Sequence, residues 1–456
     1  MNILIKNGTV VTSTQAFNSD IYISDGKIAQ LRASLNILEP IDKTINASGF
    51  YIFPGGIDPH VHMHLPTPAG FSADDFETGS KAALIGGTTT LLDFVTPQRG
   101  QSLIDALIQR NSETKNSFCD YSFHVSPIEW NNTTEQEIKD CIESGITSFK
   151  VYMAYKDNIG LNDYDILKVM QVVGKAGGIV TLHCELGDDI DELRNEIAEK
   201  GNSSPEFHPL SRPIYTESVA VKNAIEMAKK ANCPIYIVHT SCGDSIKYIK
   251  EAQRDGQRVY SETCPQYLLL NDSKYIGDFK DTCKYIMSPP LRKKEDQNTL
   301  WESINKGIVK TVGTDHCPFT LEQKEQGIND FRKIPNGAGG VEHRMKLLYS
   351  YGILQNRINY NQFVDITSTQ AAKIFGLYPQ KGEIAVGSDA DLLIWNPKIE
   401  NTISVENNYQ NCDLEIYEGA KTVGAPEIVI LNGEVVIENG ELVSTKKGNF
   451  LKREVQ

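Results

Sequence analysis

The sequence contains no run of basic residues and no basic patch interleaved with aromatic side chains. Its 45 basic and 59 acidic residues give a formal charge of −14, so we expect no nucleic-acid partner. No segment approaches the ~20 consecutive apolar residues of a membrane-spanning helix. The opening MNILIKNGTVV also lacks the charged and apolar regions of a signal peptide. We therefore expect a protein that is neither targeted to a membrane nor spans one.

The nine cysteines form no CxxC pair, and their number is odd. Most of them stand inside apolar segments of the sequence. This usage suits a reducing compartment, which predicts a cytoplasmic location.

The sequence also has no repeats or low-complexity segments. Its 456 residues exceed the length of an average single domain. From residue 57 onward, short β-rich runs alternate with helical stretches, many of them amphipathic. The eight runs are IDPHVH, TTTLLDF, YSFHVSP, SFKVYMA, IVTLHC, PIYIVHT, RVYSETC and VKTVGTD. Eight such runs predict an α/β fold of the (β/α)₈ barrel type, with a doubly wound open sheet as the structural alternative.

The two ends of the chain have a different pattern, with short alternating strands and Gly or Asn-Gly turns. Neither end could bury a core alone. We therefore expect residues 1–53 and 381–456 to pair into one small β-sandwich domain beside a barrel of residues 54–380. The final TKKGNFLKREVQ is polar enough to be mobile unless a partner subunit holds it.

Polar residues lie at the ends of the predicted barrel strands, where catalytic groups of such barrels project. They are His60 and His62 in the first run, Lys150 in the fourth, His183 in the fifth, His239 in the sixth and Asp315 in the eighth. His60 and His62 point to the same side of a strand at roughly 6–7 Å, a span that one metal ion bridges. A lone buried histidine is usually a core residue, but two on one face and two at matching strand ends predict a metal site.

Lys150, in SFKVYMAY, is the exception among these residues. An ammonium inside a barrel is costly unless it is paired or neutralised. One interpretation is a buried ion pair with Asp315, and the other is a chemically modified lysine.

Several motifs resemble the cyclic amidohydrolase superfamily and, within it, the hydantoinase and dihydropyrimidinase branch. They are GGIDPHVH, ADDFETGSKAALIGGTTTLLDF, SFKVYMAYK, YIVHTS, SETCPQYL, YIMSPPLR, GTDHCPF, IPNGAGGVEHR and GEIAVGSDADLLIW. The motifs extend from residue 54 to about residue 395, in the order that the family has. This resemblance implies a barrel with a flanking sandwich, and two zinc ions bridged by a carboxylated lysine and a hydroxide.

Carried over position by position, the resemblance implies roles for nine residues. His60, His62 and Asp315 would bind one zinc, His183 and His239 the other, and carboxylated Lys150 would bridge them. Tyr155 would hydrogen-bond the attacked carbonyl and the oxyanion, while Ser288 and Asn336 would hold the cyclic amide, partly through backbone groups. Asp315 would take the proton of the hydroxide and pass it to the leaving nitrogen, giving an N-carbamoyl amino acid.

Other residues near these motifs receive structural interpretations. His64 lies beyond the first strand and is interpreted as a loop residue, and His316 should face away from the side of Asp315. Asp74 and Asp75 should begin a helix, where acids favour the N-terminal dipole. Cys317 needs no catalytic role, because hydrolysis by a metal-activated hydroxide requires no thiol.

Alternatives to the hydantoinase interpretation remain within the same superfamily. Non-catalytic relatives that lost metal ligands act as cytoskeletal adaptors, but all six ligand positions are filled here. Dihydroorotases and allantoinases commonly carry an arginine shortly after the HxH pair, and this chain has Met63 and His64 there. An uncharged ring therefore fits better, with dihydrouracil, dihydrothymine and 5-substituted hydantoins all open. The resemblance and the unplaced tail also predict a homotetramer.

Overall fold

The computed structural model describes residues 1–455. A sheet of eight parallel strands lies at its centre, and each strand pairs with its sequence neighbours. The strands are β6 (Gly56–Val61), β9 (Thr88–Val95), β10 (Asp120–Val125), β11 (Ser148–Tyr152), β12 (Ile179–His183), β13 (Ile235–Ile237), β14 (Val259–Thr263) and β15 (Thr311–Val312). A bridge between Val61 and His316 joins β6 to the segment after β15. The sheet therefore nearly closes on itself, which confirms the barrel and excludes the open sheet.

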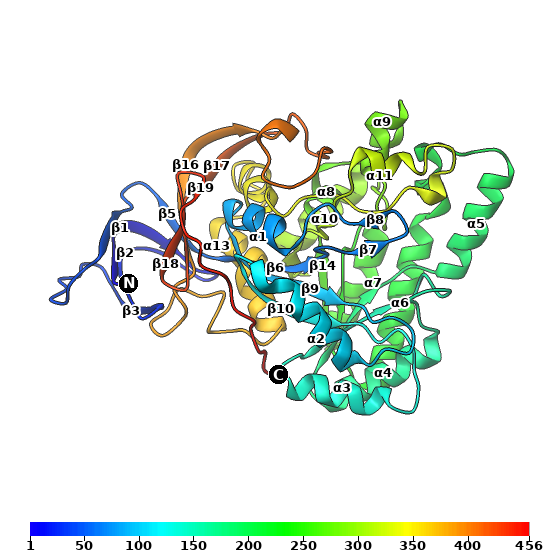
Figure 1. Ribbon diagram of the computed structural model, residues 1–456, viewed down its shortest axis with the longest axis horizontal. Coiled ribbons are helices and arrows are strands. Elements are labelled where there is room, and N and C mark those ends of the chain that lie inside the picture. Colours follow the sequence, from blue (N-terminus) through cyan, green and yellow to red (C-terminus); the bar gives the residue numbers. More distant parts are fainter. Residues whose placement is uncertain (456) are drawn as a thin grey trace.

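The helices surround this barrel (Figure 1). They are α1 (Phe76–Ile85), α2 (Leu103–Glu113), α3 (Thr134–Glu143), α4 (Asp163–Lys175), α5 (Gly187–Glu199), α6 (Ile214–Ala231), α7 (Gly243–Arg254), α8 (Pro265–Leu269), α9 (Phe279–Thr282), α10 (Lys294–Asn305), α11 (Leu321–Glu325), α12 (Arg344–Leu348), α13 (Tyr360–Val364) and α14 (Gln370–Ile374). Because helices cover the outer face and side chains fill the interior, the barrel strands are buried almost throughout. Among residues 1–455, no helix combines the length and the apolar character needed to cross a bilayer.

Both termini contribute to one nine-stranded sheet beside the barrel (Figure 1). Its strands are β1 (Ile3–Val11), β2 (Ala16–Ser24), β3 (Lys27–Arg32), β4 (Lys43–Asn46), β5 (Tyr51–Pro54), β16 (Leu392–Thr402), β17 (Lys421–Leu431), β18 (Glu434–Glu438) and β19 (Glu441–Leu442). The antiparallel pairing of β5 with β16 joins the N-terminal strands to the C-terminal ones. A short hairpin of β7 (Pro66–Thr67) and β8 (Gly70–Phe71) lies apart from both sheets. The pairing of the two termini confirms the prediction of an appended β unit.

The C-terminal tail differs from its prediction as a mobile segment. It runs along the barrel of its own chain, where the Leu451 amide donates to the Tyr121 carbonyl at 2.7 Å. Arg453 is buried and donates to the hydroxyls of Ser122 and Ser148 at 3.0 and 2.7 Å. The polar sequence of the tail could not predict these hydrogen bonds, because they form only with the folded barrel. The tail therefore needs no partner subunit to hold it.

Candidate metal centre and active site

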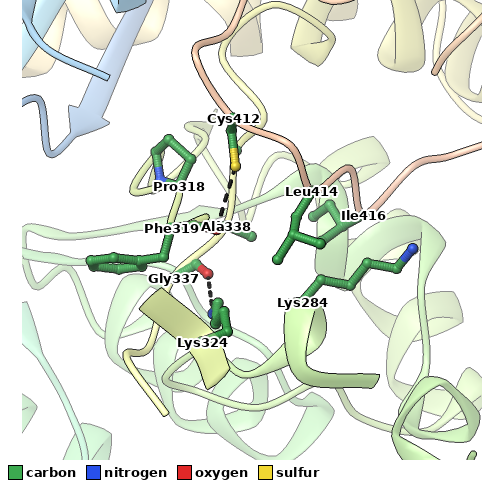
Figure 2. Close-up of a pocket in the computed structure, with 10 residues that line it drawn as sticks. Lys284, Pro318, Phe319, Lys324, Gly337, Ala338, Cys412, Leu414 and Ile416 are labelled. Atoms are coloured by element: carbon green, nitrogen blue, oxygen red, sulfur yellow. Dashed lines mark hydrogen bonds between the residues drawn. The ribbon is translucent and has the colours of Figure 1, made fainter. Parts of the chain in front are cut away.

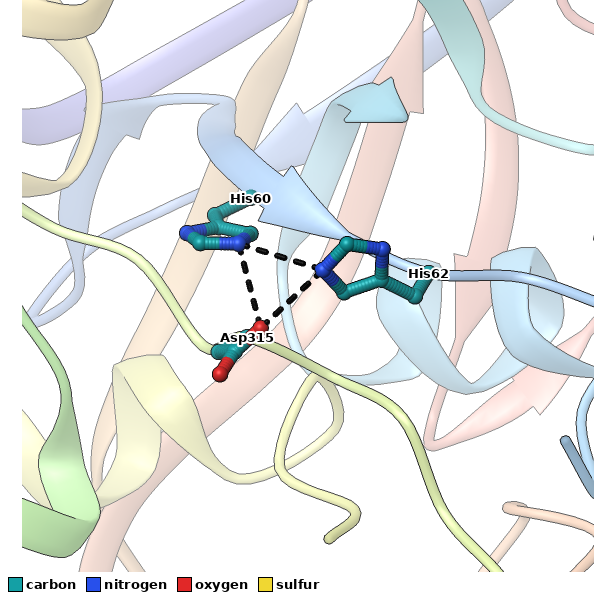
Figure 3. Close-up of side chains that lie close together, drawn as sticks. All are labelled: His60, His62 and Asp315. Atoms are coloured by element: carbon teal, nitrogen blue, oxygen red, sulfur yellow. Dashed lines mark hydrogen bonds and ion pairs between the residues drawn. The ribbon is translucent and has the colours of Figure 1, made fainter. Parts of the chain in front are cut away.

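Three predicted ligands converge where β6 and β15 end (Figure 3). His60 lies within β6, His62 follows the last residue of that strand, and Asp315 lies three residues after β15. The Nε2 atoms of His60 and His62 are 3.2 Å apart, and they lie 3.1 and 3.2 Å from Oδ1 of Asp315. All three donor atoms fall within 4.8 Å of one another. Two imidazoles and a carboxylate directed at one point form a suitable cation site.

The other two predicted histidines form a second pair beside the first group. His183 is the last residue of β12, and His239 lies two residues after β13. Nδ1 of His183 lies 2.9 Å from Nε2 of His239. The His60 and His239 ring centroids are 5.4 Å apart, so the two groups of ligands are adjacent. The barrel thus brings together all four histidines that the sequence singled out.

Lys150 lies on β11 among these groups and is 1% exposed. Burial lowers the pKa of its ammonium to about 8, although the charges of Asp315 and Glu262 act in the opposite direction. Burial is the main cause that lowers the pKa values of His183 and His239, and the charge of Lys150 adds to it. The pKa of His60 is instead raised to about 9, because Asp315 and Glu262 outweigh burial and the charge of Lys150. Within residues 1–455, its Nζ forms no ion pair with a carboxylate, so the structure does not contain the Lys150–Asp315 pair that was one of the two interpretations. It contacts the faces of aromatic rings instead, at 4.9 Å from the Phe94 centroid.

Two buried glutamates support the histidines from behind. Nδ1 of His60 lies 2.8 Å from Oε1 of Glu262, and Nε2 of His183 lies 2.8 Å from Oε2 of Glu185. Burial raises the pKa of Glu185, but Arg212 and His183 lower it more, to about 2. Histidines that bind metal usually give their other ring nitrogen to such a carboxylate. This arrangement therefore fits a metal centre on an observation independent of the ligand distances.

Neither glutamate was among the residues predicted for the site. Glu262 stands in the RVYSETC run and Glu185 follows the predicted ligand His183 by two residues, so both are acids near a barrel strand end. An acidic residue inside a buried strand, or directly after one, was the available signal.

Glu262→Gln should weaken metal binding about 10–100-fold, because the amide cannot hold the His60 imidazole as a carboxylate does. Metal titration of the purified variant, with a chromophoric chelator as competitor, measures the effect. The matched control is Glu415→Gln, since Glu415 is a buried partner of a different histidine, His343, at 3.1 Å. Equal metal affinity in wild type and Glu262→Gln would contradict this prediction.

The three predicted substrate residues lie on loops. Tyr155 follows β11, with its ring 5.4 Å from the His183 ring, and the Arg212 guanidinium lies 5.7 Å from the Tyr155 centroid. Ser288 donates from Oγ to Oδ1 of Asn336 at 3.1 Å. The segment that holds Asn336 is linked to the one after Asp315, because the Cys317 amide donates to the Ala338 carbonyl at 2.9 Å.

Three residues of this site have an unusual backbone conformation. Tyr155, His239 and Asp315 have φ values of 60°, 36° and 53°, in the left-handed region that non-glycine residues rarely adopt. Such residues persist where the surrounding structure determines the conformation, and they cluster at functional sites.

Neighbouring residues contact other parts of the chain. His64 lies in a loop, as predicted, and the centroid of its ring lies 3.9 Å from that of Phe71, on which it stacks. His316 is buried, with Nε2 3.1 Å from Oδ2 of Asp74. Asp75 alone caps α1, because its side chain accepts the Glu77 and Thr78 amides. The prediction that Asp74 also begins this helix is therefore wrong, and its buried carboxylate anchors His316 instead.

A barrel with a metal-ligand cluster at the carboxyl ends of its strands is the architecture of a metal-dependent hydrolase. The chain belongs to the amidohydrolase family, whose sequence profile matches residues 51–436. It lies in the hydantoinase and dihydropyrimidinase branch of cyclic amidohydrolases.

Close relatives cover nearly the whole chain. The D-hydantoinase of Geobacillus stearothermophilus is 42% identical over 99% of this chain and 97% of its own length. The dihydropyrimidinase of Rattus norvegicus is 39% identical over 99% of this chain and 89% of its own. The crystal structure of dihydropyrimidinase from Brevibacillus agri superposes with a TM-score of 0.98 at 40% identity, covering 100% of this chain and 99% of that one.

Proposed function

We propose that this enzyme opens the ring of a dihydropyrimidine or a 5-monosubstituted hydantoin by hydrolysis and releases an N-carbamoyl amino acid. The observation that carries the proposal is the convergence of His60, His62 and Asp315. Their Nε2, Nε2 and Oδ1 atoms lie 3.1–3.2 Å from one another. The relatives named D-hydantoinase and dihydropyrimidinase support the choice of substrate class.

We propose a centre of two zinc ions. His60, His62 and Asp315 would hold one ion, and His183 and His239 would hold the other. Lys150 would bridge them as an N6-carboxylated lysine, which turns a buried cation into an anionic oxygen ligand. When bound, a pair of divalent cations lowers the pKa of water at the site and polarises an amide carbonyl.

The chain's own residues would supply positioning and proton transfer. Asp315 would accept a proton from the attacking water and return it to the leaving ring nitrogen. The Tyr155 hydroxyl would donate to the oxygen that becomes negative during attack. Ser288 and Asn336 would hold the amide edge of the ring and so fix which carbonyl is attacked.

The guanidinium that contacts the Tyr155 ring is not free to bind a substrate carboxylate. Arg212 lies over the Tyr155 ring, but its guanidinium is paired with Glu185 at 2.5 Å. Burying an unpaired carboxylate costs several kcal/mol. This pairing supports uncharged rings over dihydroorotate.

The experiment is a substrate panel under one set of conditions, with dihydrouracil, a 5-substituted hydantoin, allantoin and dihydroorotate. We expect dihydrouracil or the hydantoin to open with a kcat/KM at least about 100-fold above that of dihydroorotate, because a buried unpaired charge costs several kcal/mol. The loss of ultraviolet absorbance measures the rate of ring opening. If dihydroorotate or allantoin led the panel, the proposed substrate class would be wrong.

We propose that the protein is a homotetramer. The likeness to the branch is the only support for this assembly, because the C-terminal tail contacts the barrel of its own chain. Sedimentation velocity of the purified protein tests it. The unpaired cysteines support a cytoplasmic protein. We retain residues 54–380 as the barrel domain and residues 1–53 with 381–456 as the second domain, and limited proteolysis tests these limits.

A further inference from the structure

Lys324 is a buried lysine outside the metal centre. It lies on the short helix α11, is 1% exposed, and contacts the backbone rather than an acid. Its Nζ donates to the carbonyls of Ile286, Pro335 and Gly337 at 3.1, 2.7 and 2.8 Å. Figure 2 shows the bond to Gly337. An ammonium has three N–H groups, so these three acceptors satisfy it completely.

The three carbonyls belong to two loops that flank the proposed substrate contacts. Ile286 stands two residues before Ser288, and Pro335 and Gly337 stand on either side of Asn336. The Gly337 amide also donates to the Ile286 carbonyl at 2.9 Å, which ties the two loops directly. Lys324 thus joins both loops at the point where Ser288 and Asn336 meet.

Other donors occupy the remaining carbonyls next to Ser288. Nε2 of His208 donates to the Met287 carbonyl at 2.8 Å, and the Tyr267 hydroxyl donates to the Pro289 carbonyl at 2.7 Å. In the described chain, the backbone N–H and C=O groups of Ser288 and Asn336 have no protein partner. The neighbouring carbonyls are therefore fixed, and the backbone groups of these two residues remain available to a ligand.

Neither an ion pair nor a nearby cavity explains why the Lys324 ammonium is buried. Burial lowers its pKa to about 8, and the groups that oppose this effect are cysteines rather than carboxylates. The cavity beside it (Figure 2) has a volume of about 10 Å³, room for roughly one water molecule. Three backbone hydrogen bonds are thus the contacts that offset the desolvation of the ammonium.

We propose that Lys324 is a positioning residue for substrate binding. It holds the Ile286–Met287–Ser288 and Pro335–Asn336–Gly337 backbones at the separation that fits the amide edge of a cyclic amide. This proposal rests on the proposed function, because the ring edge is the ligand that the two loops would hold.

The test compares Lys324→Met with wild type on dihydrouracil and on a 5-substituted hydantoin. Loss of the three donors should raise KM about tenfold or more, while kcat and the metal content stay within about threefold. A general loss of structure would lower kcat and metal content together, so the split between KM and kcat separates the two roles. The control is Lys346→Met, since Lys346 is buried on α12 with Glu342 at 3.5 Å, and its KM should not change.

An unchanged KM in Lys324→Met, or a parallel loss of kcat and metal, would overturn the positioning role. If Lys324→Met does not fold, Lys324→Gln, which keeps two N–H donors, is judged by the same criteria. Failure of the proposed function is distinguishable, because wild type itself would then open neither ring.

Discussion

Replacing Lys150 with alanine is expected to remove most of the bound metal and to lower kcat by at least about a thousandfold, a loss of several kcal/mol of transition-state stabilisation. The reason is its position: the Lys150 side chain is 1% exposed, and its charge acts on three of the proposed ligand histidines, His60, His183 and His239. Wild type should contain about two metal ions per chain, since four imidazoles, Asp315 and the proposed carbamate would supply enough ligands. Elemental analysis and steady-state kinetics measure both effects.

A rescue experiment tests whether the proposed carboxyl group on Lys150 is what the metal site requires. Short carboxylic acids added to Lys150→Ala should restore part of the metal content and activity, because they supply the missing anionic oxygen ligand. Lys346→Ala removes a buried lysine elsewhere and should keep its metal. An intact mass under non-denaturing conditions that showed unmodified Lys150 beside two bound metals would refute the carboxylation.

The second large effect is expected for Asp315→Asn, with kcat lowered about 10²–10⁴-fold. An asparagine oxygen can still approach the His60 and His62 nitrogens, but an amide cannot accept and return a proton at neutral pH. KM should change little, because the amide edge of the ring is held elsewhere. Metal content must be measured in the same sample, so that the loss of proton transfer is not confused with loss of a ligand.

Asp74→Asn is the matched control for Asp315→Asn. Asp74 is also buried, and it contacts His316, the residue after Asp315. An asparagine oxygen at this position can still accept from Nε2 of His316, so kcat should remain close to that of wild type. A metal-loaded Asp315→Asn enzyme that kept more than about a tenth of wild-type kcat would contradict the assigned proton transfer.

The barrel was predictable because its signal is local. Each strand is a short β-rich run followed by a polar residue, and buried parallel strands read as continuous apolar segments. His60, Lys150 and His183 were found in this way, since each stands at or near the end of such a run. The pairing of the two termini followed from the same reasoning, because neither set of alternating strands could cover its apolar face alone.

Contacts between distant segments were not predictable in the same way. Glu262 supports His60 across 202 positions, and Lys324 binds carbonyls of two loops that lie 38 and 11–13 positions away. The neighbouring sequence does not show which distant groups these charged side chains contact. The tail was mispredicted for this reason: Arg453 looks like part of a solvated end until Ser122 and Ser148 of the folded barrel accept its hydrogen bonds.

The sequence by itself determined the kind of fold and the kinds of ligand, because strand periodicity and the HxH spacing depend on residues that are close along the chain. Tertiary structure alone decided how those ligands combine. Closure of the barrel brings β6 beside the segment after β15, and only then do His60, His62 and Asp315 lie within 4.8 Å of one another. It likewise decided the surroundings of the buried lysines: within residues 1–455, Lys150 lies among the proposed metal ligands without an ion pair, and Lys324 donates to three backbone carbonyls. These environments are sums over segments that meet only when the whole chain is folded.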